Sequence, residues 1–430
     1  MLVNNFYQKD LLFKKYNMYI LKIFKNKKNL QYLTISLILI LAISLSYTLE
    51  FKNTYSYPQN GEKVIGVNMK GKYTSLNYDR FPNVTIMNGY YDDSFKLIKS
   101  MGLNHVRYVL YWEAYENNQK LFLQELESVA SLADKWGLNI IYDNHQFHTS
   151  SWLDENRGTG FPHFLFDKNI YLYNSETKSS GNATKLWWTN WWDRNIVHEN
   201  NKTDGWILQA NFLKTITRLL DNHNSTLGYE ILNEPQIFSE DQWSKIGQYY
   251  AFMIDEIRKQ TNKIVVIDMT ISIKFDDAAI NLTSENMVKI IPKDGNSIFK
   301  ISMYGIPMND NYQEKKLELL ENVSKLAGLP LYVGEWNHVI RDKTSTTDRK
   351  DTTKINVDKS DLTQNESDFL VNKFNKLNIQ GWAFWNWNYI DTPPKNFNLI
   401  HLTKDGEIVP TKYFHILKNS VEKLYNNLVD

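Results

Sequence analysis

The chain has 430 residues, of which 42% are hydrophobic and 14% aromatic, so it can bury a sizeable core. Its net charge is +1, which excludes the strongly basic field of a general nucleic-acid-binding protein, and no nucleic-acid partner is expected. The chain has no cysteine, which excludes disulfides, thiolate metal ligands and cysteine nucleophiles.

The N-terminal residues combine a basic leader with an apolar run. Residues 1–30 hold seven lysines against one aspartate, a local charge of +6, and residues 33–49 are uncharged and mostly apolar. This run is at the short end of what crosses a bilayer as a helix, and the lysines before it follow the positive-inside pattern. The sequence therefore predicts a basic cytoplasmic leader over 1–32, a transmembrane anchor over 33–49 and an extracytoplasmic body over 50–430.

A cleaved signal peptide is the alternative interpretation of the same run. Ser44, Leu45 and Ser46 offer small residues for cleavage before Tyr47, which would release a secreted body. The leader is long for a signal peptide, which favours the anchor. In both cases the body leaves the cytoplasm.

From residue 60 onwards, short β-branched runs alternate with amphipathic helical stretches. The runs are 63–69, 104–110, 138–144, 227–233, 263–269, 298–304, 330–336 and 381–387. Stretches such as 122–136, 243–260 and 312–328 have apolar residues at helical spacing. Eight strands alternating with helices predict an α/β fold, a (β/α)₈ TIM barrel formed by the one domain 50–430. An open doubly wound sheet is the competitor, but no G-x-G-x-x-G loop follows the first run.

Polar and aromatic side chains lie at the carboxyl ends of these runs, which is where barrels place their active sites. They are Arg107 in the second run, Asp143, Asn144 and His145 in the third, Asn233 and Glu234 in the fourth, Tyr304 in the sixth, Glu335 in the seventh and Trp385 in the eighth.

The fourth run, "LGYEILNEPQ", holds two glutamates that the strand geometry separates. Glu230 and Glu234 have the same parity, and four residues at ~3.3 Å each put Glu230 roughly 13 Å deeper in the barrel. We interpret Glu230 as an interior carboxylate paired with a basic or hydrogen-bonding neighbour. Glu234 is expected at the barrel mouth, where Pro235 ends the strand.

Glu335 supplies a second carboxylate at the same mouth. Two carboxylates on separate strands suit glycoside hydrolysis, in which one protonates the leaving oxygen and the other attacks carbon or activates water. Strands four and seven lie across a narrow barrel, which favours the separation of about 5–5.5 Å found in retaining enzymes. A metal site would need clustered His or Asp ligands, and only Asp143 and His145 offer themselves, so no metal or cofactor is expected.

The motifs together resemble glycoside hydrolase family 5, the cellulase-like retaining glycosidases. The resemblance covers about residues 60–425 and rests on "EILNEPQ" and "LYVGEWN", supported by "NHVRYVLYW", "YDNHQFH" and "GWAFWNW". It implies that Glu234 is the general acid/base, that Glu335 is the nucleophile and that the partner is a β-linked carbohydrate.

The resemblance also assigns supporting roles, each with a structural alternative. Arg107 would stabilise the ionised nucleophile, or simply pair with an interior acid such as Glu230. Asn233 would hold the substrate 2-hydroxyl. His145 and Tyr304 would complete the hydrogen-bond network, unless His145 is structural. Trp385 would form the floor under the sugar, unless it is ordinary core.

One position departs from the family pattern. The family usually has a histidine two residues before the strand-six tyrosine, and here Ser302 stands two residues before Tyr304. We therefore expect that the hydrogen bonds around Glu335 differ from the family pattern, or that the chain belongs to a divergent subfamily.

A long aromatic-rich insertion follows the third run, from about Gln146 to Asp204. Its aromatic side chains could stack on sugar rings as a cleft wall or lid, or pack against one another. They are Phe147, Trp152, Phe161, Phe164, Trp187, Trp188, Trp191 and Trp192.

These features predict a retaining, endo-acting β-glycosidase of an extracellular β-glucan. A β-mannanase and a glycolipid-directed glycosidase or transglycosylase are the alternatives on the same barrel. A catalytically silent carbohydrate-binding barrel is the alternative of another class, and the presence of both glutamates with Arg107 and Asn233 argues against it.

Overall fold

The structure is a computed structural model whose described residues belong to one unit of the chain, Ser56–Asp430. They are 63–76, 84–153, 158–166, 182–239, 241–268, 288, 291–292, 294–304, 318, 321–337, 362–388, 398–403 and 405–426. The leader and anchor predicted over 1–49 lie outside these ranges. Within them, no helix is long and apolar enough to cross a membrane.

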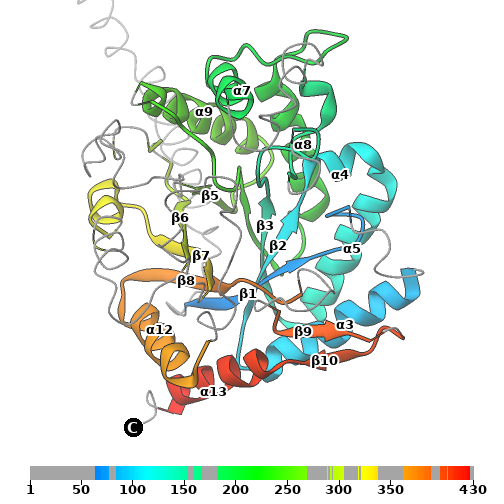
Figure 1. Ribbon diagram of the computed structural model, residues 1–430, viewed down its shortest axis with the longest axis vertical. Coiled ribbons are helices and arrows are strands. Elements are labelled where there is room, and N and C mark those ends of the chain that lie inside the picture. Colours follow the sequence, from blue (N-terminus) through cyan, green and yellow to red (C-terminus); the bar gives the residue numbers. More distant parts are fainter. Residues whose placement is uncertain are drawn as a thin grey trace, which may run out of the picture. The chain divides into compact units, whose positions relative to one another are not determined.

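Eight parallel strands form a closed barrel, in which β8 pairs with β1 (Figure 1). The strands are β1 (Val64–Lys70), β2 (His105–Leu110), β3 (Asn139–Asn144), β4 (Thr226–Glu230), β5 (Ile264–Asp268), β6 (Ser297–Tyr304), β7 (Leu331–Asn337) and β8 (Ile379–Phe384). Each overlaps one of the eight predicted runs, so the (β/α)₈ barrel is confirmed.

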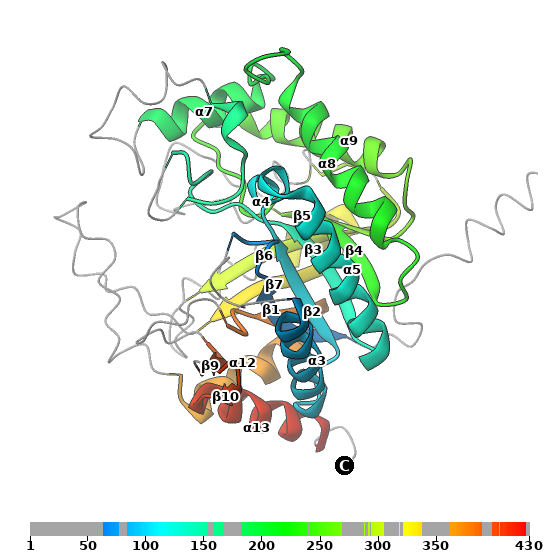
Figure 2. The ribbon, with the colours of Figure 1, turned by 90° about the vertical axis from the view of Figure 1, so that its right-hand side faces the viewer.

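Amphipathic helices cover the outside of the barrel, and Figure 2 shows α3 and α5 side by side over β2. The helices are α3 (Val84–Ser100), α4 (Trp112–Asn117), α5 (Gln119–Trp136), α7 (Asn182–Trp192), α8 (Gly205–Leu220), α9 (Gln242–Ile257), α12 (Gln364–Lys376) and α13 (Lys412–Asn426), with the 3₁₀ turn η1 (His163–Leu165). The hairpin β9 (Ile400–Leu402) and β10 (Ile408–Pro410) precedes α13.

A hydrophobic layer fills the barrel interior near the start of the strands. It is formed by Val64, Ile141, Leu227, Ile264, Val266, Ile298, Tyr332 and Ala383, which come from seven of the eight strands. The charged side chains of the interior, among them Arg107, Glu230 and Lys300, lie apart from this layer.

The fourth strand ends earlier than the sequence indicated. β4 stops at Glu230, whereas the predicted run continued to Asn233. Glu234 has a φ of 43°, in the left-handed region that non-glycine residues rarely adopt. The alternation of side chains therefore cannot be extended from Glu230 to Glu234, and the predicted depth difference of roughly 13 Å does not follow from strand geometry.

In the described part of the insertion after β3, aromatic side chains pack against one another and against Tyr249 of α9. The insertion's tryptophans Trp187, Trp188, Trp191 and Trp192 on α7 are all buried. The ring of Phe161 lies 4.7 Å from that of Trp187 and 4.9 Å from that of Trp191. The hypothesis that these tryptophans line a cleft wall is wrong, because their faces are used in a local aromatic core.

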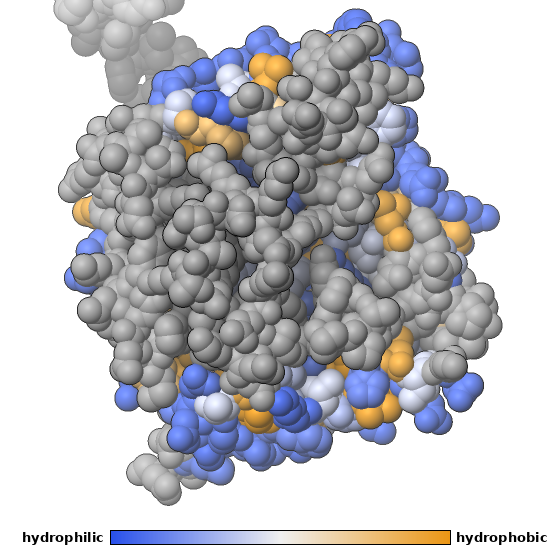
Figure 3. Space-filling model, viewed as in Figure 1, coloured by the Kyte–Doolittle hydropathy of each residue, from blue (hydrophilic) through white to orange (hydrophobic). Residues whose placement is uncertain are grey.

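Exposed hydrophobic side chains are dispersed over the described surface. The large ones are Phe147, Leu186, Ile207, Leu326 and Tyr425. On the face drawn in Figure 3, the coloured hydrophobic residues form small patches separated by hydrophilic ones. The described surface on this face therefore offers no broad apolar platform.

Candidate active site

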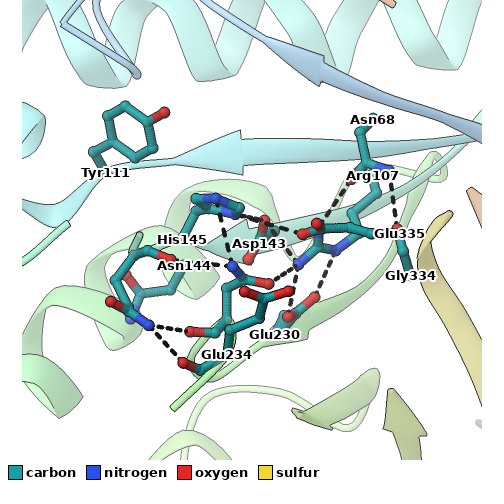
Figure 4. A network of polar contacts seen from close by, with 12 residues as sticks. Asn68, Arg107, Tyr111, Asp143, Asn144, His145, Glu230, Glu234, Gly334 and Glu335 are labelled. Atoms are coloured by element: carbon teal, nitrogen blue, oxygen red, sulfur yellow. Dashed lines mark hydrogen bonds and ion pairs between the residues drawn. The ribbon is translucent and has the colours of Figure 1, made fainter. Parts of the chain in front are cut away.

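Arg107 on β2 is fully buried and is the hub of the site (Figure 4). Its Nη1 donates to Glu335 Oε1 at 2.7 Å and to Asn68 Oδ1 at 2.8 Å. Its Nε and Nη2 donate to the two carboxylate oxygens of Glu230, both at 2.7 Å. One guanidinium thus binds both Glu230, the interior acid, and Glu335, the acid at the barrel mouth. Both partners that the sequence analysis considered for Arg107 are therefore present.

Glu335 lies on β7 with only 3% of its surface exposed. It accepts hydrogen bonds from Arg107 and from the Tyr304 hydroxyl, and Lys300 Nζ lies 3.7 Å from its Oε1. Burial acts to raise the pKa of Glu335, but the charges of Lys300 and Arg107 and the Tyr304 hydrogen bond lower it to about 2. The carboxyl is therefore ionised at neutral pH, as a nucleophile must be.

Glu234 is held in its left-handed conformation at both of its peptide groups. Its backbone N–H donates to Asp268 Oδ2 at 2.7 Å, and its carbonyl accepts from Gln146 Nε2 at 2.6 Å. Residues in such sparsely populated conformations persist where the surroundings over-determine them, and they cluster at functional sites. The last residue of β5 and the loop after β3 together fix the direction in which the Glu234 side chain leaves the backbone.

The pKa of Glu234 is shifted in the direction opposite to that of Glu335. Burial and the negative charge of Glu335 raise it to about 7, although Lys300 and a hydrogen bond from Ser302 act to lower it. Below about pH 7, Glu234 is therefore mainly protonated while Glu335 is ionised. Paired titratable groups whose pKa values are pushed apart in this way are typical of an acid and a nucleophile.

Asn233 has a fixed amide orientation. Its Oδ1 accepts from Lys300 Nζ at 2.6 Å and from Arg107 Nη2 at 3.0 Å, and its Nδ2 donates to the Gln146 carbonyl at 3.1 Å. Because two cations bind the amide oxygen of Asn233, its amide nitrogen points away from them. The amide nitrogen also lies 3.4 Å from His145 Nε2, so it donates to a substrate hydroxyl only when that hydroxyl replaces His145 or the Gln146 carbonyl as acceptor.

His145 and Trp385 form a stacked pair at the mouth, with ring centroids 5.5 Å apart and ring planes at 16°. The His145 Nδ1 donates to Asp143 Oδ2 at 2.7 Å, and burial lowers the pKa of the imidazole, which is neutral at pH 7. Trp385 is half-buried, so it is not ordinary core. The ammonium of Lys70 lies 5.8 Å from its ring centroid.

The structure brings together all seven residues expected at the site, and their roles remain predictions. It adds three residues that the sequence analysis did not single out, namely Lys300 on β6, Asp268 at the end of β5 and Asn68 on β1. A signal for Lys300 was present, because it has the same parity on one strand as Ser302 and Tyr304.

Asp143, His145 and Glu335 have ligand atoms within 4.8 Å of one another, the spacing of a metal site. Arg107, however, already binds both carboxylates, at 2.9 Å for Asp143 and 2.7 Å for Glu335. A divalent cation among these atoms would be repelled by the guanidinium. The donor set therefore fits an ion-pair network better than a metal centre.

The sequence also matches a known protein family. The sequence profile of the cellulase family, glycosyl hydrolase family 5, matches residues 59–391. No curated protein sequence matches the chain.

Solved structures share the fold at low sequence identity. An endogalactoceramidase has a TM-score of 0.60 and 16% identity, with 84% of this chain and 80% of that chain covered. The endo-glycoceramidase II of Rhodococcus sp., as its lactosyl-enzyme intermediate, has a TM-score of 0.57 and 14% identity, with 84% and 79% covered. A variant of an endo-β-1,4-glucanase of Xanthomonas axonopodis pv. citri has a TM-score of 0.55 and 12% identity, with 84% and 100% covered.

Proposed function

Because this chain belongs to the cellulase family of glycoside hydrolases, glycosyl hydrolase family 5, we propose that it cleaves a β-glycosidic bond with retention of configuration. The observation that carries the proposal is the opposite shift of two pKa values in one site, to about 7 for Glu234 and to about 2 for Glu335. Retaining hydrolysis needs an acid and a nucleophile in these protonation states.

In the first step, the Glu335 carboxylate attacks the anomeric carbon while Glu234 gives its proton to the leaving oxygen. The glycosidic C–O bond breaks and a glycosyl ester forms on Glu335. That ester carries no charge, so one cause of the raised pKa of Glu234 disappears. Glu234 is then the base that takes a proton from water, and the water oxygen displaces Glu335 from the sugar.

The remaining residues position the sugar and the nucleophile. Arg107 and Tyr304 hold the Glu335 carboxylate by hydrogen bonds, which keeps its attacking oxygen in place. The Asn233 amide nitrogen donates to the 2-hydroxyl, a contact that strengthens at the transition state. Trp385, stacked on His145, supplies the apolar floor under the ring.

An extracellular β-glucan cleaved within the chain is the first candidate substrate. A glycolipid head group is the second, and it is supported by the 40% exposed ring of Phe147. Phe147 directly follows Gln146, whose amide binds the Glu234 carbonyl, so an exposed apolar side chain follows a residue of the site in the chain. Two of the similar solved structures named above are enzymes of ceramide glycosides.

The function is tested with the full chain on a panel of β-glucans, β-mannans and glycosphingolipids. We expect hydrolysis of one class, with the anomeric configuration retained in the first product. A 2-deoxy-2-fluoro glycoside should label the peptide that contains Glu335, detected by mass spectrometry. Glu127→Gln, half exposed on α5, is the matched control.

Glu335→Gln should abolish both hydrolysis and labelling. Hydrolysis that survives this change would rule out Glu335 as the nucleophile. A product of inverted configuration would rule out the retaining mechanism. Transfer of the sugar to an added acceptor would indicate a transglycosylase.

The proposal also places the body outside the cytoplasm, held by the anchor over 33–49 or released after cleavage. The mass of the mature N-terminus distinguishes the two forms, because cleavage near Ser46 removes the whole basic leader. Recovery of the intact chain in the cytoplasmic fraction would contradict both.

A further inference from the structure

We propose that Lys300 is the positioning residue of the catalytic pair, acting through Asn233, Asp268 and Ser302. The proposal rests on the function proposed above and adds a residue that the resemblance did not suggest. Lys300 is a fully buried lysine in the middle of β6, two residues before Ser302, where the family usually has a histidine.

The three protons of the Lys300 ammonium have three acceptors. Nζ donates to Asn233 Oδ1 at 2.6 Å, to Asp268 Oδ2 at 2.7 Å and to Ser302 Oγ at 2.9 Å. An ammonium has three donors and no acceptor, so this arrangement uses all of its hydrogen-bonding capacity. Its orientation is thereby fixed, and it in turn fixes the three groups that accept from it.

Two of these groups continue directly to Glu234. Asp268 Oδ2 also accepts from the backbone N–H of Glu234 at 2.7 Å, which holds the left-handed backbone. Ser302 makes a side-chain hydrogen bond to the Glu234 carboxyl. Lys300 therefore reaches both ends of the acid/base residue, its backbone through Asp268 and its carboxyl through Ser302.

The same ammonium lies beside the nucleophile. Nζ is 3.7 Å from Glu335 Oε1 and 3.7 Å from Glu230 Oε1, on the two acids that Arg107 also binds. Burial and the charge of Arg107 act to lower the pKa of Lys300. The neighbouring carboxylates outweigh them and raise it, so Lys300 stays charged.

The charged and titratable groups that face Lys300 come from five strands and from the loops after β3 and β4. They are Arg107 of β2, Asp143 of β3, His145 after it, Glu230 of β4, Glu234 after it, Asp268 of β5 and Glu335 of β7.

The neighbouring strand leaves room for this lysine. A Cβ at Gly334 on β7 would lie 2.6 Å from both Cγ and Cε of Lys300. No side chain other than hydrogen fits at this position while the lysine keeps its place. Gly334 directly precedes Glu335, so the space for the positioning residue is built into the strand that carries the nucleophile.

The proposal is tested by the pH dependence of kcat/KM in Lys300→Met. Loss of the charge should raise the pKa values of both glutamates, so both limbs of the profile should move to higher pH, by about one unit or more. Release of the Asn233 amide should lower kcat/KM about 10- to 100-fold, mainly through kcat, since a hydrogen bond to a charged group is lost. Lys300→Arg keeps the charge and should keep the limbs in place.

Two further variants separate positioning from stability. Lys300→Met/Asp268→Asn removes one cation and one anion, so the buried charge balances, and its kcat/KM should stay low. Ser302→Ala should move only the basic limb to higher pH, because it removes the hydrogen bond to Glu234. Lys263→Met is the matched control, a partly buried lysine that donates to the His223 and Thr226 carbonyls away from the site.

If Lys300→Met folds and both limbs of its pH profile stay at the wild-type pH, the proposal is overturned. A wild-type kcat/KM in Lys300→Met/Asp268→Asn would overturn it as well. If Lys300→Met does not fold, an unmoved basic limb in Ser302→Ala overturns it. A carbon-13 NMR titration of the two glutamate carboxyls in Lys300→Met needs no substrate. A wild type that hydrolyses nothing would therefore end the proposed function, while the titration still decides the role of Lys300.

Discussion

Glu230 and Glu335 bind the same guanidinium at the same distance of 2.7 Å, yet their pKa values are about 7 and about 2. Burial and the charge of Asp143 raise the value for Glu230 against the effect of Arg107. Lys300 Nζ lies 3.7 Å from both acids, but Glu335 also accepts a hydrogen bond from the Tyr304 hydroxyl. The two cations are therefore not enough to explain the low pKa of Glu335, the proposed nucleophile, and the Tyr304 hydroxyl of β6 contributes to it.

The wild-type pH profile follows from the two catalytic pKa values. Glu335 must be ionised, so kcat/KM should rise as pH increases through about 2, and Glu234 must be protonated, so it should fall as pH increases through about 7. Initial rates of hydrolysis across the acidic to neutral pH range measure this bell-shaped profile. A maximum on the alkaline side of the Glu234 value would contradict the assignment.

At the residue scale, the sequence allowed the site residues to be predicted where they lie towards the carboxyl ends of the barrel strands. Arg107, Glu234 and Glu335 could be placed because a barrel gathers the carboxyl ends of its strands at one mouth. Lys300 could not be placed by hydrophobicity, because lysine is almost never fully buried without a partner. Apart from Ser302 on the same strand, its partners Asn233 and Asp268 come from other parts of the chain and are not visible from its own neighbours in the sequence.

Among the elements, α4 holds the insertion after β3 through one carboxyl. Glu113 accepts from the Gly160 N–H at 2.7 Å and from the Ser151 hydroxyl at 2.6 Å, and its own N–H donates to the Gly160 carbonyl at 2.8 Å. Burial raises the pKa of Glu113 to about 7. The folded protein therefore holds this proton more tightly than the unfolded chain, whose glutamates have the ordinary value of about 4.3.

Glu113→Gln should reveal this linkage. The stabilisation from the bound proton is complete below the unfolded pKa and is lost as pH rises through about 7. Between about pH 4 and about pH 8, the wild type should lose up to about 3 kcal/mol of unfolding free energy relative to Glu113→Gln. Urea unfolding measures the difference, with Glu127→Gln as the control. A difference that stays constant with pH would refute the linkage.

Gly334→Ala tests the fit between β6 and β7. The new methyl group must displace the Lys300 side chain, and overpacking of this kind costs about 1–3 kcal/mol. We expect kcat/KM to fall about tenfold or more, since Asn233 and Glu234 lose their support. Gly89→Ala on α3, whose Cβ would meet nothing within 4 Å, should leave activity unchanged. Wild-type kinetics in Gly334→Ala would show that the lysine needs no such space.

The existence of every strand could be predicted, because strands buried on both faces appear as short apolar runs. The boundaries were less certain. β4 ends three residues before its predicted end, although Ile231 and Asn233 still donate backbone hydrogen bonds to Val266 and Asn144. The packing of the insertion could not be predicted, because the same tryptophans suit a sugar platform or a local core.

On the scale of the whole molecule, the barrel is closed by the pairing of β1 with β8, which includes Val64 opposite Gly381. Removal of residues 1–55 should leave the unfolding temperature unchanged, since each strand keeps both neighbours. A chain that starts at Gly71 lacks β1 and exposes the edges of β2 and β8, so it should not fold cooperatively. Thermal unfolding of both truncated chains checks this, and a folded shorter chain would contradict the closed barrel.

The burial of the Arg107–Lys300 network also governs how the enzyme responds to ionic strength. Surface pairs such as Lys135 with Asp92, where the lysine is 55% exposed, are screened by dissolved ions. The charges around Glu335 are almost completely enclosed by protein, and buried pairs are screened much less. The ionisation of Glu335, the proposed nucleophile, should thus be nearly the same at low and at high salt concentration, so the proposed catalytic step should depend little on the salinity of the surroundings.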